Sequence, residues 1–190
     1  MSPRTPEQFE EIREEKKRLI MEVGLGLFAN EGFHSTSISR IAQKAEISKG
    51  LMYNYFESKE DLLKQIAVEG INEIFKTFDL DKDGVLSKEE FIVFIKESGT
   101  MIKSQLNFWK LYFSLMSQPH VLAALGDDFM SSFDSYFKMI ADYFNKQGVD
   151  GHTETRLFIA MLDGIALHYI IDPEHFPLEK VIDRIIKLYA

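Results

Sequence analysis

Residues 32–63 decide the fold, and they read GFHSTSISRIAQKAEISKGLMYNYFESKEDLL. Thr36 or Ser37 can cap a short helix, and Ser48 can cap a second one over residues 49–56. A turn of three or four residues would join these two helices. This arrangement is typical of a helix-turn-helix, whose second helix enters the major groove of DNA.

The outward side of the second short helix carries side chains that suit DNA. If Met52 and Phe56 face the core, the outward residues are Lys49, Gly50, Leu51, Tyr53, Asn54 and Tyr55. They offer a cation, hydrogen-bonding phenols, an amide able to read adenine edges and an aliphatic group for a thymine methyl. Glycine would let the backbone approach closely. Pairs of short helices also occur in ordinary bundles, so this structural alternative stays open.

The fuller pattern resembles the DNA-binding signature of the TetR family of repressors over about residues 14–65. An Ile-Ala pair, Ser-x-Gly, Tyr-x-x-Phe and Lys-x-x-Leu-Leu all fall in register with it. One departure is Glu46, where the family usually carries glycine in the turn. The resemblance implies a dimer that reads a palindromic operator in double-stranded DNA, with an inducer-binding region after the first three helices.

Carried over by position, the resemblance also implies which residues touch DNA. Phosphate contacts are expected from Thr36, Tyr53 and Lys59. Base or groove contacts are expected from Lys49, Gly50, Leu51, Asn54 and Tyr55. We add the capping residues Ser37 and Ser48 to this predicted DNA-binding set.

Helix formers dominate the whole chain and valine-rich alternating runs are absent, so we predict an all-α protein. A three-helix DNA-binding domain is expected over residues 1–58, and a larger helical ligand-sensing and dimerisation domain over 59–190. Further helices are predicted over residues 6–30, 58–78, 87–116, 127–145, 154–171 and 178–189. Ser98-Gly99 is a candidate break, and a helix is expected to restart at Pro119.

The region 101–171 is rich in large, adaptable side chains, which fits a ligand cavity between helices. The candidate pocket residues are Phe108, Trp109, Tyr112, Phe113, Met116, Phe133, Tyr136 and Phe137. The ligand would be apolar or aromatic and have few charged partners. Such a stripe is also what an ordinary core contains, so a cavity is not assured by it.

The last two predicted helices have broad apolar faces, more than one small domain needs to cover its core. A symmetric dimer would bury them, and a two-headed reader of a palindromic site requires one. The histidines His120, His152, His168 and His175 are scattered and show no metal-ligand spacing.

The segment 79–90 matches the EF-hand calcium loop at every constrained position. Its ligands would be Asp79, Asp81, Asp83, the backbone carbonyl of Val85 and the bidentate carboxylate of Glu90. Alternatively, Asp83-Gly84 forms an ordinary turn, and Ser87 with Glu90 forms a capping box that starts the next helix. EF-hands normally work in pairs, and the sequence contains one such loop.

The composition fits a soluble globular protein of 190 residues with a net charge of −8 and no cysteine. Disulfides and thiolate metal sites are therefore excluded. The polar start is not a secretory signal, and no apolar run is long enough to span a membrane, so we expect a cytoplasmic protein. Residues 1–65 carry a net charge of only −1. A DNA surface there would depend on placed contacts rather than on a broad basic field.

Three functions compete. The prediction is a repressor that a small apolar or aromatic ligand releases from a palindromic operator, with no required cofactor and calcium as an optional ion. The alternative is a calcium-responsive helical binding protein. An enzyme is not expected, because the sequence shows no nucleophile–base pair and no phosphate-cradling glycine loop.

Overall fold

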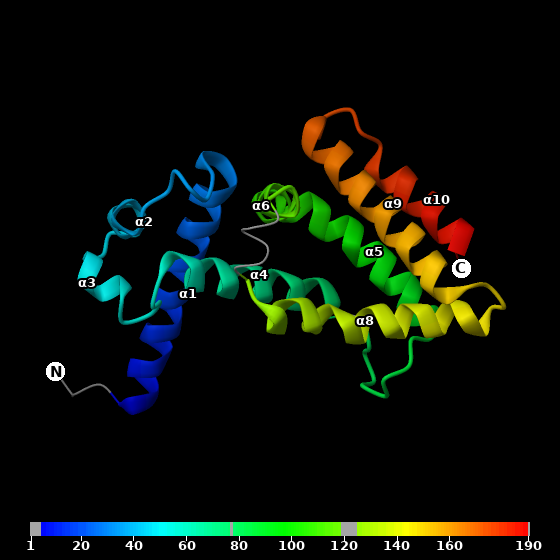
Figure 1. The fold of residues 1–190 in the computed structure, drawn as a ribbon, viewed down its shortest axis with the longest axis horizontal. Helices are drawn as coiled ribbons and strands as arrows, with labels where there is room; N and C mark the ends of the chain where they lie inside the picture. Colours follow the sequence, from blue (N-terminus) through cyan, green and yellow to red (C-terminus); the bar gives the residue numbers. More distant parts are fainter. Residues whose placement is uncertain (1–4, 77, 119–124, 190) are drawn as a thin grey trace. The chain divides into compact units, whose positions relative to one another are not determined.

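The computed structural model describes residues 5–76, 78–118 and 125–189, and within them every regular element is a helix (Figure 1). The prediction of an all-α protein is confirmed. The predicted restart at Pro119 and His120 lie outside the described residues. The helices are α1 (Pro6–Glu31), α2 (Ile38–Lys44), α3 (Lys49–Met52), α4 (Lys59–Phe75), α5 (Lys88–Ser104), α6 (Leu106–Met116), α8 (Asp127–Lys146), α9 (Gly151–Ile171) and α10 (Leu178–Tyr189).

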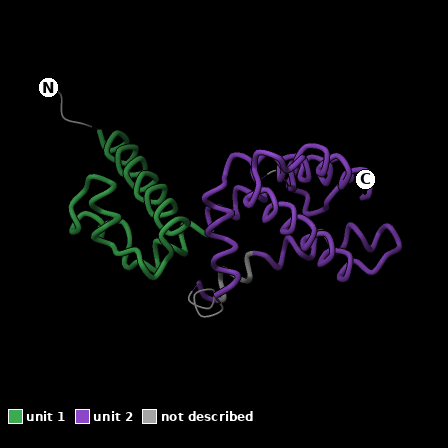
Figure 2. Tube along the Cα trace, turned by 90° about the horizontal axis from the view of Figure 1, so that it is seen from above, with its two compact units in different colours: residues 1–67 green, residues 68–190 purple. Residues whose placement is uncertain are grey.

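The chain divides into two compact units, residues 1–67 and 68–190 (Figure 2). The division falls inside α4, whereas the sequence analysis placed it before that helix, after residue 58. The reason is that the first turns of α4 belong to the core of the first unit. A side chain at Gly24 of α1 would come within 3.0 Å of Leu62, and Leu62 and Ile66 are buried.

The first unit is built from capped helices around a small apolar core. Thr5 forms a capping box with Gln8 at the start of α1, and Gly32 ends this helix with φ 88°. The first half of α1 contributes nothing to the core: its buried residues begin at Ile20, and Phe9 is 58% exposed. The core itself contains Leu27, Phe28, Ile41, Met52, Phe56, Leu62 and Leu63.

In the second unit, α8 packs against α9, and α10 packs against α5. The predicted break at Ser98-Gly99 is wrong, since α5 continues through it and ends at Ser104. Gly99 is instead a packing residue, because a Cβ there would lie 2.8 Å from Cγ1 of Ile182 on α10. The Ser98 hydroxyl donates to the Phe94 carbonyl of the same helix at 2.8 Å, so it does not interrupt α5. Among the described residues, no helix is long and apolar enough to cross a membrane.

Candidate functional site

The second helix of the helix-turn-helix is shorter than predicted. α3 ends at Met52, and Tyr53–Tyr55 form tighter turns, with the amides of Asn54 and Tyr55 donating to the carbonyls of Leu51 and Met52 at 3.1 and 3.0 Å. Tyr53, Asn54 and Tyr55 have lower helix propensities than Lys49, Leu51 and Met52 of α3. The candidate reading surface is therefore one helical turn followed by a compact loop.

This reading surface, Lys49–Tyr55, is largely open to solvent. Lys49, Gly50 and Asn54 are exposed, and Tyr53 is 51% exposed. Leu51 and Tyr55 are half-buried, so they present less of their side chains than the sequence analysis expected. A Cβ at Gly50 would meet only the Ser48 hydroxyl, at 4.0 Å, so nothing within the first unit requires glycine there.

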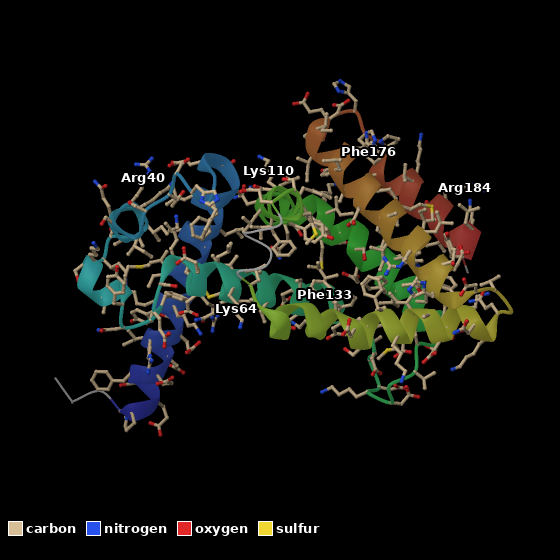
Figure 3. The ribbon with its side chains drawn as sticks, viewed as in Figure 1. Arg40, Lys64, Lys110, Phe133, Phe176 and Arg184 are labelled. Carbon is tan, nitrogen blue, oxygen red and sulfur yellow. The ribbon has the colours of Figure 1, made fainter. Side chains whose placement is uncertain are left out.

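The two predicted capping serines act as caps. The Ser37 hydroxyl accepts from the Arg40 amide at 3.2 Å, and the Ser48 hydroxyl accepts from the Leu51 amide at 3.1 Å. Arg40, labelled in Figure 3, also ties α2 to the end of α1 through an ion pair with Glu31 at 2.8 Å. These contacts fix where both short helices begin.

Two residues that the resemblance assigns to phosphate contacts have other partners in this structure. Thr36 is buried, and its hydroxyl donates to the Gly32 carbonyl at 2.9 Å. The Lys59 ammonium donates to the carbonyls of Phe33 and Thr36 at 2.9 and 3.1 Å and stands 4.3 Å from the centre of the Phe33 ring. Both side chains hold the turn before α2. Of the three implied phosphate contacts, the side chain of Tyr53 alone is openly presented.

The residue that departs from the TetR pattern has an unusual backbone conformation. Glu46, in the turn between α2 and α3, has φ 55°, in the left-handed region that favours glycine. A non-glycine residue there costs about 1–2 kcal/mol. The turn therefore keeps the geometry that glycine would adopt more readily.

The second unit contains a cavity of about 120 Å³ lined by α4, α5, α6, α8 and α9. Four of the eight predicted pocket residues line it: Trp109, Tyr112, Phe133 and Phe137. Figure 3 labels Phe133 on α8. The other described lining residues, which the sequence analysis did not assign to the pocket, are Ile71, Ile74, Phe75, Phe94, Ser98, Ile102, Ile140, Ile159, Leu162 and Asp163.

The other four predicted pocket residues do not line this cavity. Phe108 packs on Gly70, where a Cβ would lie 1.9 Å from its ring. Tyr136 stacks on Phe75 with ring centres 3.8 Å apart, and Phe113 packs against Tyr112. Met116 is 40% exposed. Phe113 and Met116 share a helical stripe with Trp109 and Tyr112, and Tyr136 shares one with Phe133, so packing alone separates these three from the lining.

Besides the Ser98 hydroxyl, three polar groups stand in the apolar lining of this cavity. The Tyr112 hydroxyl donates to Oδ2 of Asp163 at 3.5 Å. Burial raises the pKa of Asp163 to about 6, and burial together with the charge of Asp163 raises the pKa of Tyr112. The Trp109 side chain is buried, and its Nε1 has no hydrogen-bond partner among the described residues. A buried donor without a partner loses about 1–3 kcal/mol of hydration.

The loop 79–90 brings together three of its five predicted calcium ligands. One carboxylate oxygen from each of Asp79, Asp81 and Asp83 lies within 4.8 Å of the others. The Asp83 amide lowers the pKa of Asp81, but desolvation and the neighbouring carboxylates outweigh this effect and raise it overall. A cluster of this kind would be relieved by a cation.

The fourth side-chain ligand, Glu90, is engaged elsewhere. Its carboxylate accepts from the Leu80 amide at 2.8 Å and from the Ser87 hydroxyl at 2.6 Å, and it completes the capping box of α5. The Val85 side chain is 43% exposed, and its amide donates to Asp83 at 2.7 Å. Glu90 would have to turn from these partners to bind an ion.

Residues 20–66 match the sequence model of the family described as bacterial regulatory proteins, tetR family. Over these residues the chain is similar to TetR-family regulators. The match lies wholly within the first unit and covers α2, α3 and the start of α4. A second family model, described as an EF-hand domain pair, matches residues 58–98, which include the loop 79–90.

The chain is also similar to several known proteins. It is 55% identical over 49 residues to the uncharacterized HTH-type transcriptional regulator YuxN of Bacillus subtilis, covering 26% of this chain and 17% of that protein. It is 26% identical over 89 residues to the fatty acid metabolism regulator protein of Bacillus subtilis, covering 46% of each. The matches thus span less than half the length of both relatives.

Among solved structures, FadR from Bacillus subtilis in complex with stearoyl-CoA has a TM-score of 0.73 and 16% identity, covering 90% of this chain and 96% of that one. At this identity the likeness shows the fold alone. This likeness of fold extends over both units of the chain.

The position of the Lys59 ammonium predicts a structural role. Replacing Lys59 with Met removes two charge-assisted hydrogen bonds, so we expect the free energy of unfolding to fall by about 2 kcal/mol. Chemical denaturation measures this fall, with Lys44→Met as the exposed control, for which we expect a change below about 0.5 kcal/mol. If Lys59→Met kept full stability and lost only DNA affinity, Lys59 would be a phosphate contact after all.

The raised pKa of Asp163 predicts a pH-dependent stability. The folded state binds this proton more tightly than the unfolded state, so the carboxyl destabilises the fold increasingly as the pH rises from about 4 to above 6. Asn mimics the neutral acid. We therefore expect Asp163→Asn to gain about 1–2 kcal/mol at pH 7.5 and almost nothing at pH 4.

Denaturation of Asp163→Asn and wild type at the two pH values checks this, with the exposed Asp183→Asn as the matched control. A gain that is the same at both pH values, or no gain at all, would show that Asp163 is not destabilised by burial.

Proposed function

We propose that this protein is a DNA-binding transcriptional regulator that reads an operator through α3 and the turn after it. The observation that carries the proposal is the open reading surface Lys49–Tyr55, which lies within the residues that match the TetR family. Two helices present this surface, and their starts are fixed by the caps at Ser37 and Ser48. The Arg40–Glu31 ion pair joins α2 to α1. Direct readout of bases needs such a rigid presentation.

The regulator acts, in this proposal, as a repressor that a small apolar or aromatic ligand releases. Support comes from the cavity in the second unit, whose described lining is mostly aliphatic and aromatic. The structural neighbour FadR was solved with stearoyl-CoA, so a protein with this fold holds a ligand with a long apolar chain. Release requires that the ligand bind one conformation of the protein better than the other.

We further propose a homodimer, which a palindromic operator requires. Support comes from an apolar stripe on α9: Leu157 is 51% exposed, Leu167 is 41% exposed and Ile171 is 69% exposed. Gly164 lies between them, and a Cβ there would meet nothing within 4 Å. A second copy of the same helix could approach closely at this point and bury the stripe.

Selection of operators from random duplexes tests the regulator proposal. A palindrome should be enriched, and Lys49→Ala and Asn54→Ala should each weaken its binding about tenfold or more without lowering the melting temperature. Lys96→Ala, which removes an exposed cation from the second unit, is the matched control and should leave affinity unchanged. No enriched sequence, or equal effects at Lys49 and Lys96, would refute the assignment.

The dimer proposal predicts that a charge in the α9 stripe separates the two copies. Leu167→Glu should sediment as a monomer in analytical ultracentrifugation, because an unpaired carboxylate would be buried in the contact. Phe9→Glu, which changes an exposed apolar residue of the first unit, should leave the dimer intact. A monomeric wild type, or a dimeric Leu167→Glu, would contradict the proposal.

As a second candidate function, we propose that the loop 79–90 binds calcium. Two observations favour it: the three converging aspartates, and the EF-hand domain pair model that matches residues 58–98. Calcium takes six to eight oxygen ligands, so Glu90 would leave Leu80 and Ser87 and close the site. Since the loop joins α4 to α5, ion binding would act on the helices that follow the DNA-binding unit.

Calorimetric titration with calcium tests this candidate. Glu90→Gln removes the bidentate ligand but keeps a residue that can complete the capping box, so affinity should fall about tenfold or more while α5 stays intact. Glu89→Gln, one residue away, removes the same charge and should bind calcium normally. Absence of binding by wild type, or equal affinities of the two variants, would exclude the site; operator affinity with calcium and with a chelator then tests the coupling.

A further inference from the structure

The cavity in the second unit has a one-sided charge. Of its described lining residues, Asp163 alone carries an ionisable carboxyl, and none is a lysine, arginine or histidine. The other lining side chains come from five helices. They are aliphatic or aromatic, and hydroxyl groups occur only on Ser98 and Tyr112 among the described lining residues. An anionic head group placed here would meet a carboxylate and no cation, which opposes its binding.

The same cavity has an unsatisfied donor. Trp109 is 8% exposed, and its buried Nε1–H has no acceptor among the described residues. The other polar hydrogens are occupied: the Ser98 hydroxyl donates to the Phe94 carbonyl, and the Tyr112 hydroxyl donates to Asp163. An indole N–H can only donate, so a group that completes it must be an acceptor.

Aromatic rings surround these two polar features. Trp109, Tyr112, Phe133 and Phe137 all line the cavity together with Asp163. Aromatic faces attract organic cations, most strongly where water is excluded, and a buried carboxylate attracts them further. The lining thus combines three recognition elements: a carboxylate with rings for a cation, an N–H for an acceptor, and an apolar wall for a hydrocarbon chain.

We propose that the cavity binds a lipophilic organic cation that carries a hydrogen-bond acceptor, with its ammonium group beside Asp163 and its acceptor on Nε1 of Trp109. This inference rests on the proposed function, in which the same cavity holds the releasing ligand, and it adds a cationic group and a hydrogen-bond acceptor to that otherwise apolar ligand. The proposed ligand differs in charge from stearoyl-CoA, the ligand with which the neighbour FadR was solved, because stearoyl-CoA carries no organic cation. The bound cation would stabilise the ionised form of Asp163 and so lower the pKa of this carboxyl in the complex.

Intrinsic fluorescence tests the proposal directly, since Trp109 is the single tryptophan of the chain. The probes are hexanoylcholine, its neutral carbon isostere 3,3-dimethylbutyl hexanoate, and hexanoate. All three share the acyl chain, and the first two share their shape and differ in charge. We expect hexanoylcholine to change the emission and to bind at least about tenfold more tightly than either of the others.

Asp163→Asn should weaken the binding of hexanoylcholine about tenfold and change the affinity for the neutral isostere by less than about twofold. The exposed Asp183→Asn should change neither affinity. A measurement without a mutant supports it: in wild type, affinity for hexanoylcholine should fall between pH 7.5 and 5 as Asp163 takes a proton, and affinity for the isostere should not. Among the described lining residues, Tyr112 of α6 is the other titratable group, while α4, α5 and α8 contribute none.

Tighter binding of hexanoate or of stearoyl-CoA than of hexanoylcholine would overturn the proposal, and so would a hexanoylcholine affinity that ignores both Asp163→Asn and pH. A complete lack of response to all probes would overturn it as well. None of these assays contains DNA. Their failure would therefore leave the regulator proposal standing on operator selection, whereas failure of operator selection with successful cation binding would refute the regulator alone.

Discussion

The ammonium group of Lys59 makes the contact that positions the helix-turn-helix within the first unit. It joins the start of α4 to the turn at Phe33–Thr36, and that turn leads directly into Ser37, the cap of α2. α2 in turn sets the position of Glu46 and of the cap of α3. Because these links are short and largely polar, a shift of the turn would move the reading surface Lys49–Tyr55 as a whole. One part-buried contact therefore influences how this surface is presented.

The second unit depends on a different constraint, which is the burial of a carboxyl. Asp163 lies in an apolar cavity with the Tyr112 hydroxyl as its partner among the described residues, and burial raises its pKa to about 6. A group held in this way is costly to the fold and sensitive to what enters the cavity. The unsatisfied N–H of Trp109 adds to the same cost. Such local costs are typical of binding sites, where a ligand removes them.

Much of this architecture could be predicted from the sequence, because it depends on local rules. Capping residues at Thr5, Ser37, Ser48 and Ser87 mark helix starts, and the recurrence of apolar residues marks the faces between them. The roles of Thr36 and Lys59 could not be predicted in this way. Lys59 reaches carbonyls more than twenty positions earlier in the chain, and no periodic pattern records such a contact.

The cavity was predictable as a region but not as a set of residues. Ten of its described lining residues were missed, because five helices contribute to it and residues of one stripe, such as Trp109 and Phe113, do not all reach the cavity. The helix break predicted at Gly99 was wrong for a related reason. Glycine often ends a helix, whereas here it leaves room for the Ile182 side chain. In both cases the deciding factor is how closely one helix approaches another.

The central claim is that α3 and the turn after it read DNA. Amide chemical shifts, followed by NMR while a selected operator duplex is added, test it most directly. If these residues read DNA, the largest changes fall on residues 48–55, and the buried core around Phe28 and Leu62 keeps its shifts. Changes confined to residues 68–190 would contradict DNA reading by α3. The absence of any change, with a duplex that the protein binds, would contradict it as well.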